Sequence, residues 1–270
     1  MSIHSYHTSH RSPRTFYKLG RRGTLERVAN PNKAMFFGVE LEVESPRIDP
    51  DDLSDKVDEL MGNLATCEHD GSLCEGFEII TQPATSQAFI EGFKVDELCS
   101  LLDSNGAKSH DTRSCGLHVH VSKAAIGSSE RAQDMVCAKL LVLMDKFTPQ
   151  LTAFARREWE HGRWAPKYSY FNADGENSTD KLLKKFKPCK DSGDRYHALN
   201  LTNEATIEFR IFRGTLNPLA IKATVELCET LVRFCMGHTT PQIQACTWGD
   251  IIATCNRPEL AEYCAKRNIA

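Results

Sequence analysis

The sequence lacks a long hydrophobic run. Although 41% of its 270 residues are hydrophobic, no stretch reaches the roughly 18 consecutive apolar residues that a membrane-spanning helix needs. Residues 1–34 are polar throughout and contain no apolar core of the kind found in signal peptides. We therefore expect a cytoplasmic protein with no membrane partner.

The sequence also lacks a regular cysteine framework and a strong excess of charge. Its 11 cysteines are odd in number and irregularly spaced, so we expect reduced thiols. Cys67, His69, Cys74 and Cys115 contain no paired Cys-x-x-Cys spacing, which argues against structural zinc. A net charge of −3 argues against a protein that coats nucleic acid.

Charge is nevertheless uneven along the chain. Residues 1–34 contain seven Lys or Arg and a single acidic residue, Glu26. This basic N-terminal arm could bind nucleic acid or an acidic partner, and it could equally be a surface extension without a ligand. The histidines at 4, 7 and 10 are only a compositional signal for metal.

Three segments alternate apolar and polar residues with the period of two that is typical of a β-strand: 36–44, 116–122 and 205–212. Their polar faces comprise Glu40, Glu42 and Glu44 in the first, His118, His120 and Ser122 in the second, and Glu208 and Arg210 in the third. A single half-solvated strand often shows such alternation. Three strands rich in Glu and His indicate instead a face that binds divalent cations.

The remaining pattern predicts an α+β fold with about six strands in an antiparallel or mixed sheet. Helices are expected over 49–64, over 86–104, over 130–155 with an interruption at Pro149, and after Gly214. We expect one hairpin over 65–82, which turns at Asp70-Gly71 and adds Glu78 to the polar face, and a second hairpin of 195–202 with 205–212. A short strand is expected at 107–110 and a loop with a short helix over 156–194. For Asp70 we favour the turn role over substrate contact. The composition of the long loop fits a lid and a solvated surface segment equally well. Its Arg156, Arg157, Arg163 and Lys167, with Arg195 beyond it, are lesser phosphate or carboxylate candidates.

The ordered motifs FGVELE, DGSL, GLHVHVS and TIEFRIFRGTL resemble the amidoligase family, relatives of glutamine synthetase and glutamate–cysteine ligase. The resemblance covers roughly 35–220. It implies a curved, mainly antiparallel sheet with helices packed on one side, similar to the glutamine synthetase catalytic domain. We accordingly expect a basic arm at 1–34, a catalytic domain at 35–220 and C-terminal helices of the same domain at 221–270.

The resemblance further implies an ATP-dependent carboxylate–amine ligase that works through an acyl phosphate with Mg²⁺ or Mn²⁺. By motif position, Glu40, His118 and Glu208 would hold the metal that bridges the ATP phosphates. Glu42 and Glu78 would hold a second metal near the acceptor carboxylate. His120 and Ser122 would contact nucleotide, and Arg210 the transferring phosphate. Thr206 departs from the glutamine synthetases, which often have arginine there.

Two other hypotheses remain open. One is a single-metal oxygenase or hydrolase that uses His118 and His120 together, although Ala124 and Ala125 stand where its usual Glu would follow. The other is a non-enzymatic module that binds nucleotide or nucleic acid through the arm. The substrates, a carboxylate and an amine that are small molecules or peptides, are not specified by the phosphate-handling motifs.

Overall fold

The computed structural model describes residues 3–4, 14–110, 112, 114–157, 165–168, 171, 176, 178–255 and 257–269. His7, His10, Arg163 and most of the first 13 residues lie outside these ranges, as do parts of the expected lid. None of the described helices is both long enough and apolar enough to cross a bilayer.

The chain forms two compact units. Unit 1 comprises Met1–Val119 and Arg213–Lys222, and unit 2 comprises His120–Phe212 and Ala223–Ala270. The chain passes between them at three points, inside the strands β6 (Gly116–Ser122) and β8 (Thr206–Arg213) and inside the helix α7 (Pro218–Gly237). The linear division into arm, catalytic domain and C-terminal helices stays a prediction.

A six-stranded sheet runs in the order β4-β5-β3-β6-β8-β7, which confirms the expected α+β class. The other strands are β3 (Phe37–Glu44), β4 (Ala65–Glu68), β5 (Gly76–Thr81) and β7 (Leu199–Asn200). β3 with β5, β4 with β5, and β7 with β8 are antiparallel pairs. The strand expected over 195–202 is thus much shorter than its apolar pattern suggested.

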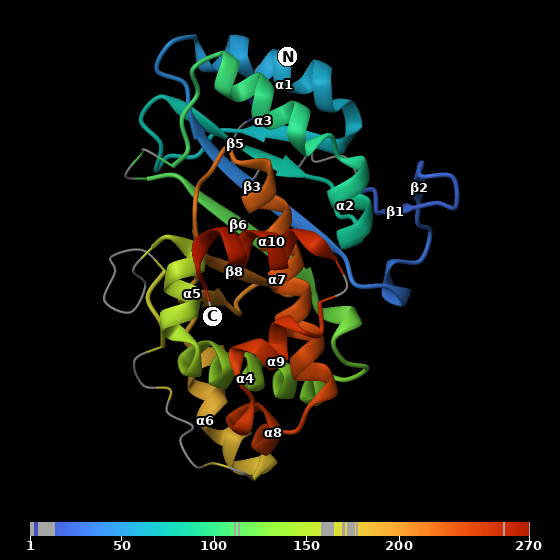
Figure 1. The fold of residues 1–270 in the computed structure, drawn as a ribbon, viewed down its shortest axis with the longest axis vertical. Coiled ribbons are helices and arrows are strands. Elements are labelled where there is room, and N and C mark those ends of the chain that lie inside the picture. The colour runs from blue at the N-terminus through green and yellow to red at the C-terminus, as the bar shows by residue number, and fades with distance from the viewer. Residues whose placement is uncertain are drawn as a thin grey trace. The chain divides into compact units, whose positions relative to one another are not determined.

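In unit 1, helices pack beside the strands β4 and β5. Its α1 (Pro50–Met61) begins at Asp49, whose side chain accepts a hydrogen bond from the Asp51 amide, and buries Leu53 and Val57. α1 packs against α3 (Val95–Ser104) and against β4 and β5 (Figure 1).

Three details of unit 1 differ from the sequence prediction. The helix expected over 86–104 is two helices, α2 (Ser86–Gly92) and α3, because Lys94 adopts a left-handed conformation with φ of 52°. The strand expected at 107–110 is a single bridge between Lys108 and Glu44. A hairpin of β1 (Tyr17–Leu19) and β2 (Leu25–Arg27) was not predicted.

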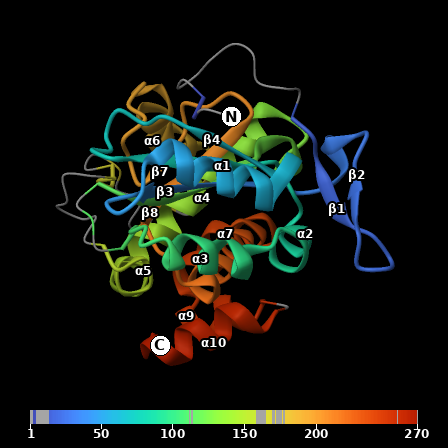
Figure 2. The ribbon, with the colours of Figure 1, turned by 90° about the horizontal axis from the view of Figure 1, so that it is seen from above.

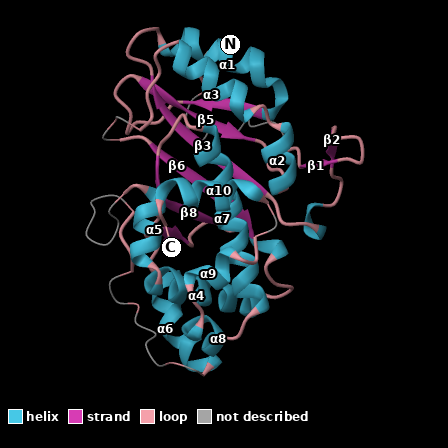
Figure 3. Cartoon of the chain, in the orientation of Figure 1, coloured by secondary structure: helices cyan, strands magenta, loops and turns pink. Residues whose placement is uncertain are grey.

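Unit 2 is mostly helical (Figure 3). Its helices are α4 (Glu130–Lys146), α5 (Thr148–Ala155), α6 (Thr179–Asp191), most of α7 (Pro218–Gly237), α8 (Thr240–Ala245), α9 (Trp248–Ile252) and α10 (Pro258–Arg267). The expected interruption near Pro149 is confirmed, with Pro149 in the first turn of α5. α4 packs against α5, α6 and α8.

Candidate functional site

In unit 1, the polar side chains of β3 and β5 lie on the same face of the sheet. Their antiparallel register places Glu42 directly opposite Glu78, and the two residues are only 4% and 3% exposed. The neighbouring apolar residues of β3 are buried on the other face, as the alternation predicted. Like charges directly opposite one another destabilise a sheet, so this pair needs a compensating group.

Unit 1 contains two groups of side chains that could each hold a metal ion. Glu40, Glu78 and His118 form the first, and Glu42, Asp70 and Glu78 form the second; in each group one ligand atom per residue lies within 4.8 Å of the others. Glu78 belongs to both. We call these five residues the Glu78 cluster.

His118 lies among carboxylates of β3. Its Nδ1 is 3.5 Å from Oε2 of Glu40, and its Nε2 is 3.8 Å from Oε1 of Glu42. The imidazole is 5% exposed. Both ring nitrogens therefore face acidic oxygens in a dry environment, an arrangement suited to holding a cation beside the ring.

The carboxyl group of Glu78 lies in an environment that disfavours its ionised form. Burial raises the pKa of Glu78 to about 10. The negative charges of Glu40, Glu42 and Asp70 contribute further to this increase in the pKa. A divalent cation would oppose the effects of burial and of the neighbouring charges on this pKa, because it favours the ionised carboxylate.

Gly116 permits the close packing of this cluster. Its backbone N–H donates a hydrogen bond of 2.5 Å to Oε2 of Glu42. A Cβ atom on Gly116 would lie 2.8 Å from Nε2 of His118 and 3.4 Å from Oε2 of Glu42. Glycine is therefore the residue that this approach of backbone to carboxylate requires.

Asp70 forms the turn that its sequence predicted and also lies in a metal-capable group. Its Oδ1 accepts a hydrogen bond of 2.7 Å from the Ser72 amide, so the predicted turn is present. The same side chain also belongs to a metal-capable group with Glu42 and Glu78. The signal in the sequence was the hairpin itself, which carries Asp70 at its turn and Glu78 on its returning strand.

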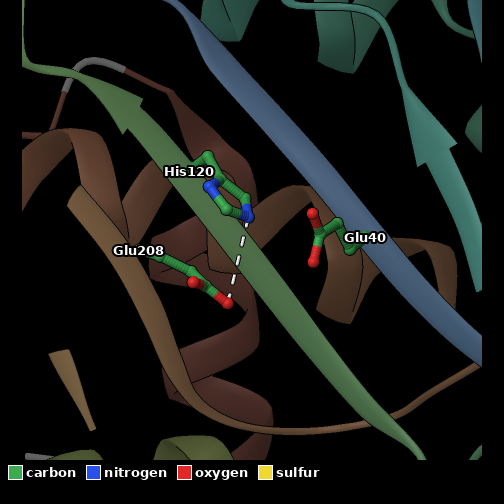
Figure 4. Close-up of side chains that lie close together, drawn as sticks. All are labelled: Glu40, His120 and Glu208. Atoms are coloured by element: carbon green, nitrogen blue, oxygen red, sulfur yellow. Dashed lines mark ion pairs between the residues drawn. The ribbon is translucent and has the colours of Figure 1, made fainter. Parts of the chain in front are cut away.

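In unit 2, the side chains of His120 and Glu208 lie close together. Nε2 of His120 is 3.9 Å from Oε1 of Glu208, and Figure 4 shows the two side chains directed toward each other. Nδ1 of His120 lies 3.2 Å from Oγ1 of Thr206. Thr206, which stands where the glutamine synthetases often have arginine, thus positions this imidazole.

Glu208 is 3% exposed and receives donors on both oxygens. Arg210 donates to Oε1. Oε2 accepts hydrogen bonds of 2.7 Å from Asn200 and 3.3 Å from Asn203. Ser122, at the end of β6, is partly buried in this unit.

Backbone contacts hold the donors of Glu208 in place. Oδ1 of Asn200 accepts hydrogen bonds from the amide and the hydroxyl of Thr202, at 2.9 and 2.8 Å, so its amide nitrogen must face Glu208. Nζ of Lys123 donates to the carbonyl of Asn203 at 2.5 Å and to that of Leu201 at 3.4 Å. Lys123 and Asn203 were not predicted from the sequence, because neither belongs to a recognised motif.

Most of the lesser candidates have structural contacts. Lys167 pairs with Asp145 at 3.0 Å, and the guanidinium of Arg195 lies over the ring of Tyr196. Arg156 ends α5 in a left-handed conformation. His4 forms a bridge with Glu68. The 11 cysteines are free thiols, and among the described residues none joins a metal-capable group.

The fold and the Glu78 cluster define an α+β protein with a buried, metal-capable acidic face. Residues 27–232 match the model of a family described as "Putative amidoligase enzyme", and the chain belongs to this amidoligase family. The resemblance stated from the sequence is confirmed, and the family supports ligase activity in general and small-molecule substrates.

No curated protein matches the chain. Among solved structures, one described as "Apo GmaS without ligand" is similar at 13% identity and a TM-score of 0.44, over 87% of this chain and 68% of that one.

Proposed function

We propose that this protein is an ATP-dependent carboxylate–amine ligase that forms an amide bond through an acyl phosphate. The observation that carries the proposal is the Glu78 cluster in a chain of the amidoligase family. Phosphoryl transfer from ATP requires neutralisation of phosphate charge more than covalent help from the protein. A buried group of carboxylates supports that task, because carboxylate oxygens bind divalent cations.

The residues of the cluster fit divalent ions. Carboxylate oxygens suit Mg²⁺ and Mn²⁺, and the imidazole of His118 is compatible with Mn²⁺. The raised pKa of Glu78 supports this fit, because it reflects negative charge that a cation would balance. We propose that Glu40, Glu78 and His118 hold one ion and that Glu42, Asp70 and Glu78 hold another. When bound, such ions supply charge neutralisation at the phosphates.

The proposed reaction has two steps. A carboxylate oxygen of the first substrate attacks the γ-phosphorus of ATP, and the bond from that phosphorus to the β–γ bridging oxygen breaks to release ADP. The nitrogen of the amine then attacks the carbonyl carbon of the acyl phosphate. The C–O bond breaks, phosphate leaves, and the nitrogen loses a proton.

Arg210 and Glu208 are proposed to act as a pair in this reaction. We assign Arg210 to the transferring phosphate, since a guanidinium can donate two parallel hydrogen bonds to phosphate oxygens. Glu208 orients Arg210 in the structure through their ion pair. By motif position we also assign Glu208 to the metal at the ATP phosphates, and His120 and Ser122 to nucleotide contact.

The sequence does not favour the single-metal alternative, because Ala124 and Ala125 stand where its usual Glu would follow.

Thermal unfolding tests the proposed function. We expect Mg²⁺ with a non-hydrolysable ATP analogue to raise the Tm of the wild type and of Glu59→Gln, an exposed control on α1. The increase should be lost in Glu78→Gln, which keeps the side-chain volume but removes the charge. ATP hydrolysis should then require the addition of a mixture of candidate carboxylates and a mixture of candidate amines. An equal increase in Tm for Glu78→Gln, or hydrolysis indifferent to both substrates, would contradict the proposal.

A further inference from the structure

The hairpin of β1 and β2 is firmly anchored in unit 1. We call residues 14–28 the basic hairpin. Tyr17 is 7% exposed, its amide donates to the Pro83 carbonyl at 2.9 Å, and its carbonyl accepts from the Thr85 amide at 2.9 Å. Its ring packs edge-on against Phe93. β1 is thus held to the segment that follows β5.

The second strand of the hairpin is also anchored. A Cβ atom on Gly92 would lie 2.6 Å from Cδ2 of Leu25, so Leu25 packs directly on the end of α2. Figure 2 shows both strands beside α2, with their connecting turn extending outward. The basic segment is therefore a structured element that presents its side chains in fixed positions.

The basic hairpin carries unbalanced positive charge. Its basic residues are Arg14, Lys18, Arg21, Arg22 and Arg27, all exposed, and its one acidic residue is Glu26. Five positive charges and one negative charge give a net charge of +4. Glu26 pairs with Lys18 at 3.1 Å. Among the described residues, no hydrogen-bonding or acidic partner is found for Arg21, Arg22 or Arg27.

β2 also presents an open strand edge. In the antiparallel ladder, Lys18 pairs with Glu26, and the bonds that flank them join Gly20 to Thr24 and Phe16 to Val28. The backbone groups of Leu25 and Arg27 therefore point away from β1. In the described part of the chain no strand pairs with β2 on that side. Such an edge can accept an added strand.

We propose that the basic hairpin binds an extended acidic polypeptide that pairs with the edge of β2. The peptide backbone would bond to Leu25 and Arg27, and its carboxylates would meet Arg21, Arg22 and Arg27. Two other occupants fit less well. A second copy of the hairpin would bring like charges together, and single-stranded nucleic acid usually needs exposed aromatic rings, whereas Phe16 and Tyr17 pack against Phe36 and Phe93.

The basic hairpin is connected to the strand that carries the Glu78 cluster. Ala84 forms bridges with both Tyr17 and Phe37, and Phe37 begins β3. Glu40 is three residues further on, about 10 Å along the strand at the usual rise per residue. We assign a peptide held at the hairpin as a source of the carboxylate substrate, whose chain would extend from β2 past β1 toward β3. This assignment as substrate rests on the proposed ligase function, whereas the binding does not.

Binding can be measured on the full chain without ATP. The probe is a fluorescent peptide of about twelve residues that alternates Glu and Val, a length and pattern suited to strand addition. We expect the triple variant Arg21→Ser, Arg22→Ser, Arg27→Ser to bind about tenfold more weakly, with a reduced dependence on salt. The control, Lys181→Ser, Lys184→Ser, Lys185→Ser, removes the same charge from exposed positions of α6 and should bind as the wild type does.

Three results of this measurement would overturn the proposed binding. The first is an equal loss of peptide affinity in the hairpin and α6 variants. The second is tighter binding of single-stranded DNA than of the peptide at equal charge. The third is unchanged affinity for a peptide whose alternate amides are N-methylated. The last result would show that the backbone edge is not used, because an N-methyl amide cannot donate to a strand.

A turnover measurement separates the substrate assignment from the ligase function. With pooled amines, the peptide should stimulate phosphate release by the wild type more than by the hairpin variant. Stimulation by small carboxylates but not by the peptide would overturn the substrate assignment alone. Peptide binding without phosphate release for any carboxylate would overturn the ligase function and with it the assignment as substrate, while the peptide-binding surface would remain.

Discussion

Two buried glutamates, Glu78 in unit 1 and Glu208 in unit 2, are in opposite electrostatic environments. They are equally buried, at 3% exposed. Glu208 has hydrogen-bond donors at both oxygens, namely Arg210, Asn200 and Asn203. Glu78 faces other carboxylates, and its pKa is raised to about 10.

This difference indicates what each side chain can do. A carboxylate that accepts several hydrogen bonds keeps a fixed orientation. A carboxylate among carboxylates is stabilised when a proton or a metal cation arrives. Glu208 thus has a fixed orientation without a cation, whereas Glu78 needs a proton or a cation.

Removing the two glutamates should have opposite effects on the metal-free protein, the largest contrast that we predict. Glu208→Ala leaves Arg210 without its partner and should lower the free energy of unfolding by about 3 to 5 kcal/mol. Glu78→Gln should leave it unchanged or raise it, since glutamine removes the cost of burying a carboxyl group among other carboxylates. Urea unfolding in EDTA measures both, with the exposed Glu204→Ala as control. A loss of stability in Glu78→Gln as large as that in Glu208→Ala would invalidate the contrast.

Gly116→Ala should disturb the Glu78 cluster from the backbone side. The added methyl group would contact His118 and Glu42, and we expect a loss of about 1 to 3 kcal/mol of stability, as for other overpacked sites. Gly237→Ala is the control, because nothing lies within 4 Å of that position. Thermal unfolding of both variants checks this, and equal Tm values would contradict it.

Lys123→Met should loosen the donors of Glu208 without changing the cluster of unit 1. It removes a charged hydrogen bond to the Asn203 carbonyl, and we expect a loss of about 1.5 kcal/mol. Metal affinity at the Glu78 cluster should be unaffected. A loss of metal binding in this variant would show that the two regions do not act independently.

The smallest effect that we predict is a change in the pH dependence of stability, caused by a third buried glutamate, Glu226. Burial is the main cause that raises the pKa of Glu226. Its Oε2 accepts a hydrogen bond of 2.6 Å from the Leu260 amide, and Cys255, Arg257 and Glu259 are its titratable neighbours.

For Glu226, the folded chain holds a proton that the unfolded chain releases at lower pH. The contribution of Glu226 to stability is therefore full below the pKa that this residue has in the unfolded chain. It declines as the pH rises through the pKa that Glu226 has in the folded chain. Glu226→Gln should reduce this decline, as measured by urea unfolding across pH. An identical pH profile in the variant would contradict the assigned cause.

Much of the candidate site could be predicted because strands with one buried face have a period of two. That periodicity alone places Glu40, Glu42 and His118 on polar faces. It could not show which polar residues meet. The position of Glu78 opposite Glu42 depends on the hairpin register, and the position of Lys123 depends on a contact with a turn about 80 residues away.

The fold was predicted less well where local signals are weak. The break between α2 and α3 falls at Lys94, and its local signal is the single Gly92 that ends α2, which does not by itself exclude a continuous helix. The β1–β2 hairpin has strands of only three residues with few apolar side chains, so its pattern resembled a surface extension. Its structure depends on tertiary contacts such as that of Leu25 with Gly92, which no local pattern shows.

A titration with Mn²⁺ tests the central claim, that Glu78 is shared by two metal positions. Isothermal titration should give two ions per chain for the wild type and one for Asp70→Asn. Glu78→Gln should weaken both by about 100-fold or more, beyond the usual effect of residues that only support a ligand. Two ions bound with unchanged affinity by Glu78→Gln would contradict the account.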